Sequence, residues 1–447
     1  MNAKHGVTRL SRRDFMVVSA GSATALVAGC ATNPVTGRNQ LMLMSEASEL
    51  SMDQQWAPHQ FSSDYGASQD KELNEYISQV GNDIARHSHR AQMPYNFRVL
   101  NTTVVNGYTF PAGSVGLARG LMIMMENESQ LAAVLGHEIG HVNYRHAGER
   151  MTKQLAWTGA VALLSAYLAY EKKKYAAIAA GLGAIGANML LCRYSRENER
   201  EADEIGMEYM VRAGHNPGGM VGLMDGFRKL GKSKPNVVEL LFASHPMSDE
   251  RYNTAVARIT EKYSDKEGFP VNKERYMDHT SRLRAMRGAI EKMQQGDSLL
   301  MKNNLSQAEI IYREALQLAP NDYAGLLMMA KCQLAQKKSL EAGRFADEAK
   351  SVYPEEPQAK HVCGMARMES RKFDMALNDF SAYEQALPGN TNTIYFKGLC
   401  YDRMNKKTEA ANEYQKYFKQ DPNGEHGEEV KTRLIQWGYL VEEKKTS

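Results

Sequence analysis

The last third of the chain repeats with a period of 34 residues, and three separate positions keep this step. Proline recurs four times, alanine lies twelve residues before each proline, and a small residue lies twelve residues before each alanine. The positions are Gly296, Ala308 and Pro320; Ala330, Ala342 and Pro354; Gly364, Ala376 and Pro388; and Gly398, Ala410 and Pro422. Small residues allow two helices to cross closely, and proline ends the second helix. We therefore expect four stacked helix pairs, which form an α-solenoid.

This repeat resembles the tetratricopeptide (TPR) repeat. The resemblance implies a superhelix whose concave groove binds a segment of another protein. We expect the TPR domain at residues 291–440, after a polar and charged linker at residues 271–290.

The N-terminus has the composition of an export signal. The basic segment "SRRDF" precedes the apolar run "MVVSAGSATALVAG", so we expect a signal peptide at residues 1–29 that resembles a twin-arginine signal. The segment "LVAGC" resembles a bacterial lipobox, which implies lipidation of Cys30. We thus expect a periplasmic protein that acyl chains anchor to the outer membrane. A generic signal or membrane anchor is the alternative.

The charge of the mature chain is balanced. The formal net charge is +3, but residues 1–29 hold four basic groups and one acid, which leaves 51 basic (55 − 4) and 51 acidic (52 − 1) residues. This balance gives no reason to expect a nucleic-acid partner. Cys192, Cys332, Cys363 and Cys400 have no CxxC spacing, so we expect neither a zinc knuckle nor a redox pair. The last three lie in apolar helical segments, and we expect them to be buried free thiols.

The segment "AAVLGHEIGHVNYRH" (132–146) contains an HExxH motif on an apolar helix. His137 and His141 are four residues apart, so their rings share one helix face and can hold Zn²⁺. Glu138 can then act as the general base toward the attacking water. Two core or surface histidines are the alternative. Before this helix, "YNFRVLNTTVVNGYTF" and "AGSVGLARG" alternate enough to predict a small β-sheet.

A catalytic zinc ion needs a third protein ligand. His146 lies five residues after His141, off the ligand face, and we expect it at the surface. In "SRENEREADEIGMEYM", Glu199 and Asp203 are four apart on one helix face. We expect Glu199 to bind zinc, Asp203 to accept the ring N–H of a ligand histidine, and Glu201 to point elsewhere.

Five features together resemble one family: "NPVTGRNQL", "HEIGH", "SRENEREAD", "SHPMSDER" and the repeats. The chain resembles gluzincin metallopeptidases of the CAAX-prenyl-protease and HtpX type, and more closely their BepA-like members with C-terminal TPR repeats. The resemblance implies a zinc endopeptidase that degrades misfolded or stalled envelope proteins, with a chaperone-like role in outer-membrane assembly. It also implies the barrel-assembly machinery as partner in the TPR groove, and an edge strand within residues 104–118 that binds the substrate.

The expected fold is mainly α. An HExxH zinc metallopeptidase domain with a small β-sheet, at residues 30–270 and with one Zn²⁺ per chain, precedes an α-solenoid of TPR helix pairs. The apolar segments 155–170 and 176–192 are short for a bilayer, so we expect a hairpin that is buried or lies on the membrane. A transmembrane hairpin is the alternative.

His245, in "SHPMSDER", has two candidate roles. It can stabilise the transition state, or it can occupy the open metal position as a gate or fourth ligand. We favour the gate.

Two other functions remain open from the sequence. The chain can be a chaperone or adaptor with an inactive or structural metal site, or a zinc amidase that acts on peptidoglycan. Glu138 favours the peptidase over the chaperone, and the repeats disfavour the amidase, because such repeats bind polypeptides.

Overall fold

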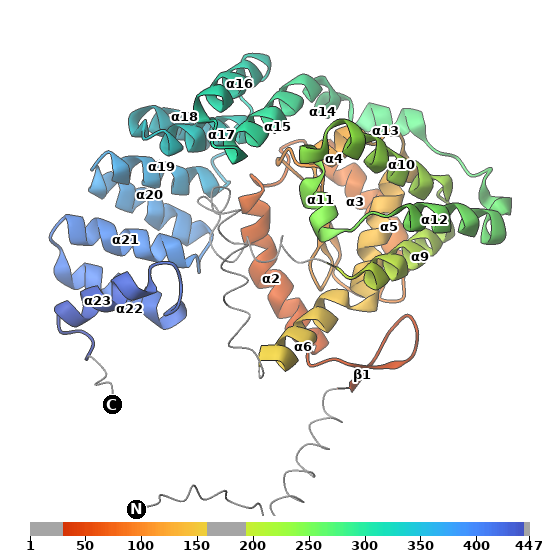
Figure 1. Ribbon diagram of the computed structural model, residues 1–447, viewed down its shortest axis with the longest axis horizontal. Helices are drawn as coiled ribbons and strands as arrows, with labels where there is room; N and C mark the ends of the chain where they lie inside the picture. Colours follow the sequence, from red (N-terminus) through yellow and green to blue (C-terminus); the bar gives the residue numbers. More distant parts are fainter. Residues whose placement is uncertain (1–29, 159–193, 442–447) are drawn as a thin grey trace, which may run out of the picture.

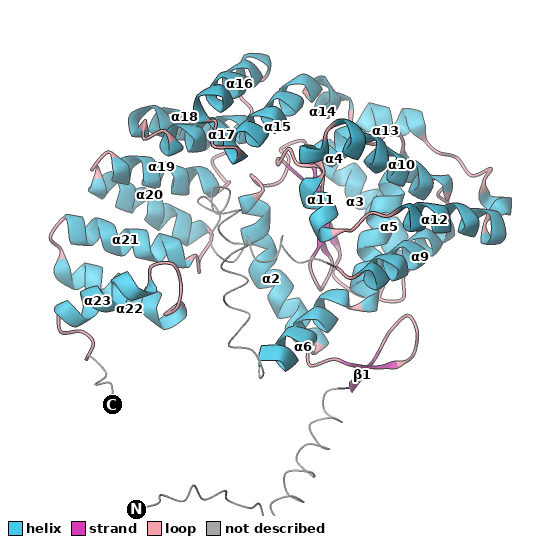
Figure 2. Ribbon diagram, in the orientation of Figure 1, coloured by secondary structure: helices cyan, strands magenta, loops and turns pink. Residues whose placement is uncertain are grey.

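The structure, a computed structural model, describes residues 30–158 and 194–441. Helices dominate, and strands occur only in the N-terminal half of this described part (Figure 2). The prediction of a mainly α fold with a small sheet, followed by a helical solenoid, is confirmed. The expected signal peptide and nearly all of the two apolar segments lie outside the described residues. Within them, no helix is long and apolar enough to cross a membrane.

The N-terminal half, which we call the peptidase part, surrounds helix α5 with strands and helices (Figure 1). Its elements are β1 (Cys30–Thr32), β2 (Asn39–Leu41), α2 (Glu46–Ser63), α3 (Lys71–Arg86), β3 (Asn96–Leu100), β4 (Gly107–Thr109), β5 (Ser114–Ala118), α4 (Arg119–Met124), α5 (Glu128–Tyr144), α6 (His146–Thr158), α9 (Arg196–Arg212), α10 (Gly218–Ser233), η1 (Pro235–Val237), α11 (Glu239–Ser244), α12 (Asp249–Lys262) and η2 (Ser264–Lys266).

Two small sheets belong to this part. Strands β1 and β2 form an antiparallel pair, and the second sheet has the order β3-β5-β4. Strand β3 runs parallel to β5, whereas β4 is antiparallel to it and lies at the edge of the sheet. One side of β4 is therefore free to pair with another extended segment.

Helices α5 and α9 cross at very short distance because a glycine stands on each side of the crossing. A Cβ atom on Gly136 would lie 2.6 Å from the carbonyl oxygen of Gly206, and a Cβ atom on Gly206 would lie 2.7 Å from the amide nitrogen of His137. Any larger residue would push the helices apart. This contact sets how closely α9 approaches the HExxH residues.

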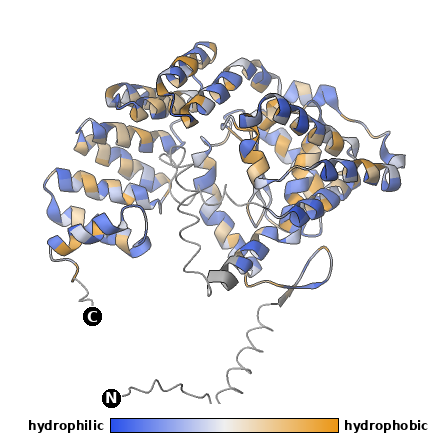
Figure 3. Ribbon diagram, in the orientation of Figure 1, coloured by the Kyte–Doolittle hydropathy of each residue, from blue (hydrophilic) through white to orange (hydrophobic). Residues whose placement is uncertain are grey.

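The C-terminal half is the solenoid. Its helices are α15 (Arg287–Met301), α16 (Leu305–Leu318), α17 (Tyr323–Ala335), α18 (Ser339–Val352), α19 (Gln358–Glu369), α20 (Phe373–Ala386), α21 (Thr391–Arg403), α22 (Lys407–Gln420) and α23 (Gly427–Gln436). They form an arc from α15 to α23, with α2 between this arc and the rest of the peptidase part (Figure 1). Apolar and polar residues alternate along these helices, as expected when each helix buries one face (Figure 3).

The repeated small residues lie at the helix crossings, as their spacing predicted. A Cβ atom on Gly364 would lie 2.6 Å from the ring of Phe380, and Gly398 has the same relation to Tyr414. In the second repeat Ala330 replaces the glycine, and a second alanine replaces the aromatic residue. The repeated alanines of the second helices, Ala308, Ala342, Ala376 and Ala410, are all fully buried. Cys332, Cys363 and Cys400 are buried free thiols.

Residues 271–290, expected as a linker, are largely helical. They contain α13 (Lys273–His279) and α14 (Ser281–Ala285), and they run directly into α15. Tyr276 is fully buried, and its hydroxyl donates to the carbonyl oxygen of Met122 at 2.6 Å. This polar stretch thus packs on the peptidase part through a few buried apolar side chains, such as Tyr276 and Leu283, whereas Val271 is exposed.

Buried polar contacts join the solenoid to the peptidase part. Arg119, the first residue of α4, forms an ion pair with Asp322 at 2.5 and 2.9 Å, and both side chains are less than 5% exposed. The hydroxyl of Ser62 donates to Glu356, and Gln294 donates to the carbonyl oxygen of Thr103 at 2.6 Å.

Candidate metal centre

Helix α5 carries the HExxH residues through the centre of the peptidase part. It begins where the side chain of Asn127 accepts a hydrogen bond from the amide of Gln130. His137, Glu138 and His141 are 8, 3 and 2% exposed, so the motif faces the interior. The ring nitrogens Nε2 of His137 and His141 lie 3.1 Å apart, because a spacing of four residues stacks them one turn apart.

Helix α9 brings Glu199 to the same point. A capping box at Ser195 starts this helix, which places Glu199 in its first turn. Glu199 is fully buried, and its Oε1 lies 3.5 Å from Nε2 of His141, while its Oε2 lies 3.6 Å from Nε2 of His137. The structure thus brings together the three residues that the sequence proposed as ligands.

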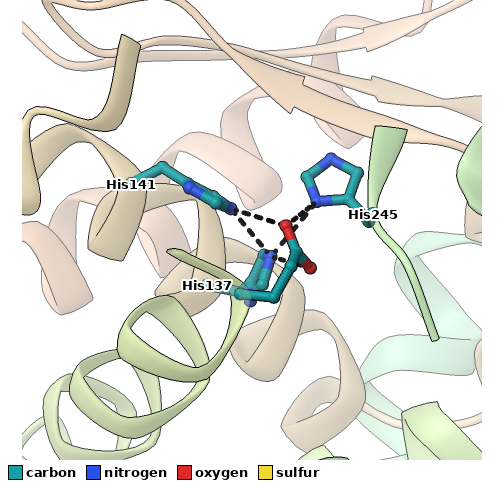
Figure 4. Close-up of side chains that lie close together, drawn as sticks. His137, His141 and His245 are labelled. Carbon is teal, nitrogen blue, oxygen red and sulfur yellow. Dashed lines mark hydrogen bonds and ion pairs between the residues drawn. The ribbon is translucent and has the colours of Figure 1, made fainter. Parts of the chain in front are cut away.

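His245 completes a group of four donors. It follows the last turn of α11 and is 5% exposed. Its Nδ1 lies 3.0 Å from Oε1 of Glu199 and 3.4 Å from Nε2 of His137. Figure 4 shows the three histidine rings converging on one point. One donor atom from each of His137, His141, Glu199 and His245 lies within 4.8 Å of all the others.

These distances fit a metal ion such as zinc. A tetrahedral zinc ion with bonds of about 2.0–2.1 Å to nitrogen separates its donors by about 3.3 Å. The donor pairs described above lie 3.0–3.6 Å apart. Two or three imidazoles with one carboxylate are also a donor set that zinc favours. The residues therefore fit the ion that the sequence implies.

Carboxylate and guanidinium groups surround this cluster and set its charge. Nδ1 of His137 lies 2.9 Å from Oδ1 of Asp203, which in turn forms a two-point ion pair with Arg251 at 2.7 and 2.8 Å. Burial by itself raises the pKa of Asp203, but Arg251 outweighs burial and holds this pKa below its ordinary value. The ionised Asp203 accepts the ring N–H of His137, which leaves Nε2 of that ring free for a metal.

The pKa of Glu199 follows the same balance. Burial raises it, but the combined effect of His245, His137 and His141 is larger and lowers this pKa well below its ordinary value. Burial likewise lowers the pKa of His245, whereas the Glu199 carboxylate raises it, and the net shift is upward. The charges of Glu199 and His245 thus stabilise each other across the 3.0 Å between Oε1 and Nδ1.

Glu138 has a different environment. Its Oε2 is buried and has no hydrogen-bond partner among the described residues. Burial raises the pKa of its carboxyl group, and the lowering by His245 and His137 does not cancel this effect. A buried carboxylate oxygen without a partner, next to a group of metal donors, is suited to accept a proton from a bound water molecule.

Two pockets meet at His245. One lies beside Glu138 and is lined mainly by apolar side chains, including Met220, Leu223 and Phe227. The other lies toward the edge strand and is lined by residues such as Tyr108 and Tyr194. Gly107 of β4 belongs to the first pocket and its neighbours Asn106 and Tyr108 to the second. His245 therefore lines both pockets, and residues of β4 contribute to each of them.

The expectation that His146 lies at the surface is wrong. His146 is 1% exposed, and its Nδ1 lies 2.8 Å from Nδ1 of His141. The reason is local: Arg145 has a left-handed conformation (φ 60°) that ends α5, so His146 starts a new helix and folds back under His141. Glu201 does point away from the four donors, and its Oε2 lies 3.0 Å from Nε2 of His146.

Sequence reasoning gave no role to two residues at the site. Arg251 holds Asp203, and the ring of Tyr194 stacks on His141 with a centroid distance of 3.8 Å. Arg251 stands at the end of "SHPMSDER", six residues after His245, which was the available signal. Tyr194 directly precedes the cap of α9 and has no motif of its own. The side chain of Cys30, the expected lipidation site, lies outside the description.

Comparison with known proteins gives consistent relatives. Residues 71–259 match the family model described as Peptidase family M48. A beta-barrel assembly-enhancing protease from Yersinia pestis is 25% identical over 347 residues, which cover 72% of this chain and 70% of that protein. The protease of the same name from Escherichia coli (strain K12) is 29% identical over 42% of this chain, an alignment that spans 39% of that relative. Metalloprotease YcaL from Escherichia coli (strain K12) is 32% identical over 42% of this chain and 68% of its own length.

Proposed function

The chain belongs to peptidase family M48, and from this premise we propose that it is a zinc-dependent endopeptidase of the bacterial envelope. Its substrates are misfolded or stalled outer-membrane and periplasmic proteins. Family membership confirms the resemblance that the motifs indicated. The observation that carries the proposal is the cluster of His137, His141 and Glu199 around one point, with the unpartnered carboxylate of Glu138 beside it.

Each residue of this cluster has a separate role in peptide hydrolysis. A zinc ion held by His137, His141 and Glu199 would polarise the scissile carbonyl and lower the pKa of the attacking water to about 7. Glu138 takes the proton from that water and then transfers it to the leaving amine. Asp203 fixes the tautomer of His137, so that Nε2 faces the metal.

The substrate chain lies along β4. This strand is one of the two edges of its sheet among the described residues, and its residues and their neighbours line both pockets beside His245. An extended polypeptide can add to such an edge through main-chain hydrogen bonds. One of its apolar side chains then fits the pocket formed by residues such as Met220 and Phe227. An unfolded protein offers both features, whereas a folded barrel protein hides them.

The solenoid selects and locates the substrates. We propose that its groove binds a component of the outer-membrane barrel-assembly machinery; two relatives are named beta-barrel assembly-enhancing proteases, which supports this choice of partner. A chaperone-like role in assembly follows, because bound proteins that fold correctly are released uncut. Lipidation of Cys30 would hold the protein in the periplasm at the outer membrane.

The two alternatives differ from this proposal in specific ways. A chaperone with a structural metal site has no use for Glu138, and a peptidoglycan amidase has no use for the solenoid. The unpartnered oxygen of Glu138 and the edge strand β4 favour peptide hydrolysis over both.

The test uses Glu138→Gln in the full chain, because the amide cannot accept a proton while the metal donors stay intact. We expect unchanged zinc content and a loss of casein hydrolysis of roughly 100-fold or more. Glu126→Gln, at an exposed position before α5, is the matched control and should cleave like the wild type. Equal cleavage by Glu138→Gln and wild type would contradict the proposal. Release of peptidoglycan fragments by the wild type alone, without casein cleavage, would favour the amidase.

A further inference from the structure

His141 has a second contact that the proposed function does not use. The ring of His146 meets it on the side opposite the metal donors, Nδ1 to Nδ1 at 2.8 Å. The other nitrogen of His146, Nε2, lies 3.0 Å from Oε2 of Glu201. Three side chains from α5, α6 and α9 thus form one hydrogen-bonded row that ends at the metal donors.

When His146 is neutral, the carboxylate at the outer end fixes the direction of every hydrogen bond in this row. An ionised carboxylate only accepts, so Nε2 of His146 must carry the hydrogen and donate it to Glu201. A neutral His146 then has its lone pair on Nδ1, which accepts the Nδ1–H of His141. His141 is left with its lone pair on Nε2, the nitrogen that lies 3.1 Å from Nε2 of His137.

The opposite arrangement is excluded by the same carboxylate. If Nδ1 of a neutral His146 donated to His141, then Nε2 of His146 would carry a lone pair. Two acceptors, this Nε2 and Oε2 of Glu201, would then face each other at 3.0 Å. His141 would also carry its hydrogen on Nε2 and could not bind a metal through that atom. With a neutral His146, the row therefore supports only the tautomer that a metal site needs.

Packing holds both rings in place. Tyr144 stacks on His146 with an interplanar angle of 14°, and Tyr194 stacks on His141 at 20°. His146 itself is 1% exposed, whereas the Glu201 side chain is 36% exposed. The buried ring of His146 thus constrains His141 the most, and the half-exposed Glu201 carboxylate orients the His146 ring.

We propose that His146 and Glu201 are positioning residues for the metal, which fix the tautomer and orientation of His141. They correspond in role to Asp203, which supports His137 directly; here a second imidazole stands between the ligand and the carboxylate. The proposal rests on the proposed function, because it assigns His141 as a metal ligand. The proposal also explains the left-handed conformation of Arg145, because this residue turns the chain so that His146 reaches His141.

The test measures metal affinity rather than activity. Metal-free full-length chains with His146→Phe, His146→Asn, Glu201→Ala and Glu199→Ala are titrated with Zn²⁺ against a chelator, and the absorption bands of bound Co²⁺ are recorded. Phenylalanine keeps a buried ring but offers no acceptor. Asparagine places an amide oxygen near the former Nδ1, so it should restore the hydrogen bond from His141.

We expect His146→Phe to weaken zinc binding by roughly 10–100-fold and to shift the Co²⁺ bands, since loss of such supporting contacts has effects of this size. His146→Asn should recover most of the affinity. Glu201→Ala should lose less zinc affinity than His146→Phe. Glu199→Ala should lose the most affinity, because it removes a metal ligand.

The control is His215→Phe, which replaces a buried imidazole of the same part that lies outside this row. It should leave zinc affinity and the Co²⁺ bands unchanged. Metal-free melting temperatures show whether each variant folds. Wild-type zinc affinity in a folded His146→Phe would overturn the positioning role and leave the proposed function intact. A wild type that binds no zinc would overturn both.

Discussion

We propose that His245 decides whether the metal centre is open or closed. Zinc sites with four protein donors are structural, whereas catalytic sites keep one position open for water or substrate. His245 supplies a fourth donor at 3.0 Å from Glu199, and it also lines both pockets beside β4. Both observations favour the role of a gate over that of a transition-state stabiliser, because a fourth protein donor would take the metal position that water needs.

We therefore predict that His245→Ala raises cleavage of casein and also causes self-cleavage, because the fourth position becomes open to water. Cleavage is followed by gel electrophoresis on zinc-loaded protein, with His87→Ala at an exposed position as control. A stabiliser of the transition state would give the opposite result, a fall of roughly 100-fold or more. Unchanged activity would exclude His245 from the site.

The residues of the site differ in how far the sequence could predict them. His137 with His141, and Glu199 with Asp203, are each spaced by four within one helix, so their common face follows from helix geometry alone. His146 was placed wrongly because a single left-handed residue ends the helix before it. Arg251 contacts Asp203 across 48 residues, and no local spacing reports such a contact.

At the scale of elements, the solenoid repeats a feature beyond its small residues and prolines. The turn between the two helices of each repeat contains a non-glycine residue with φ between 57 and 62°, and these residues are Asn303, Lys337, Arg371 and Asn405. They also keep the step of 34. Asparagine tolerates the left-handed conformation better than lysine or arginine does.

Arg371→Asn should therefore raise the free energy of unfolding by roughly 0.5 kcal/mol, because two other repeats already use asparagine there. Arg344→Asn is the matched control: Arg344 lies inside α18, so the same change should destabilise by a similar amount. Urea unfolding of the full chain measures both. An equal loss of stability in the two variants would show that the left-handed turn conformation does not favour asparagine over arginine at position 371.

The period predicted the helix pairs well, because small residues and prolines have a fixed role at each crossing and end. It did not reveal the left-handed turn residues, since their side chains vary from asparagine to lysine and arginine. The short strands of the peptidase part were predicted only approximately. Strand β4 has three residues, and pairing with β5 rather than local sequence defines it.

At the scale of the whole molecule, the solenoid is fixed to the peptidase part rather than tethered to it. The expected linker is helical and packed, and Arg119 and Asp322, 203 residues apart, meet in a buried ion pair. The sequence could not predict this ion pair, because Arg119 and Asp322 each have the sequence context of an ordinary charged residue in a helix or at a helix cap. The proposed partner in the solenoid groove would therefore be held near the metal centre by a packed interface rather than by a flexible linker.

The last prediction tests this connection. Arg119→Met leaves the Asp322 carboxylate buried and without its partner, and loss of one member of a buried pair costs about 3–5 kcal/mol. Asp322 also caps α17 through the amide of Gly325, so the second change is Asp322→Asn, which keeps a capping oxygen. The double variant should recover most of the lost stability, because no charge remains buried.

Arg200→Met is the control, since Arg200 and Glu250 form an exposed ion pair at 2.8 Å, which contributes about 1 kcal/mol or less. Urea unfolding followed by circular dichroism should show one transition for the wild type. For Arg119→Met we expect an earlier unfolding that splits into two transitions, one for each half of the molecule. A single transition at the wild-type midpoint would mean that the two halves are coupled by their apolar contacts and not by this ion pair.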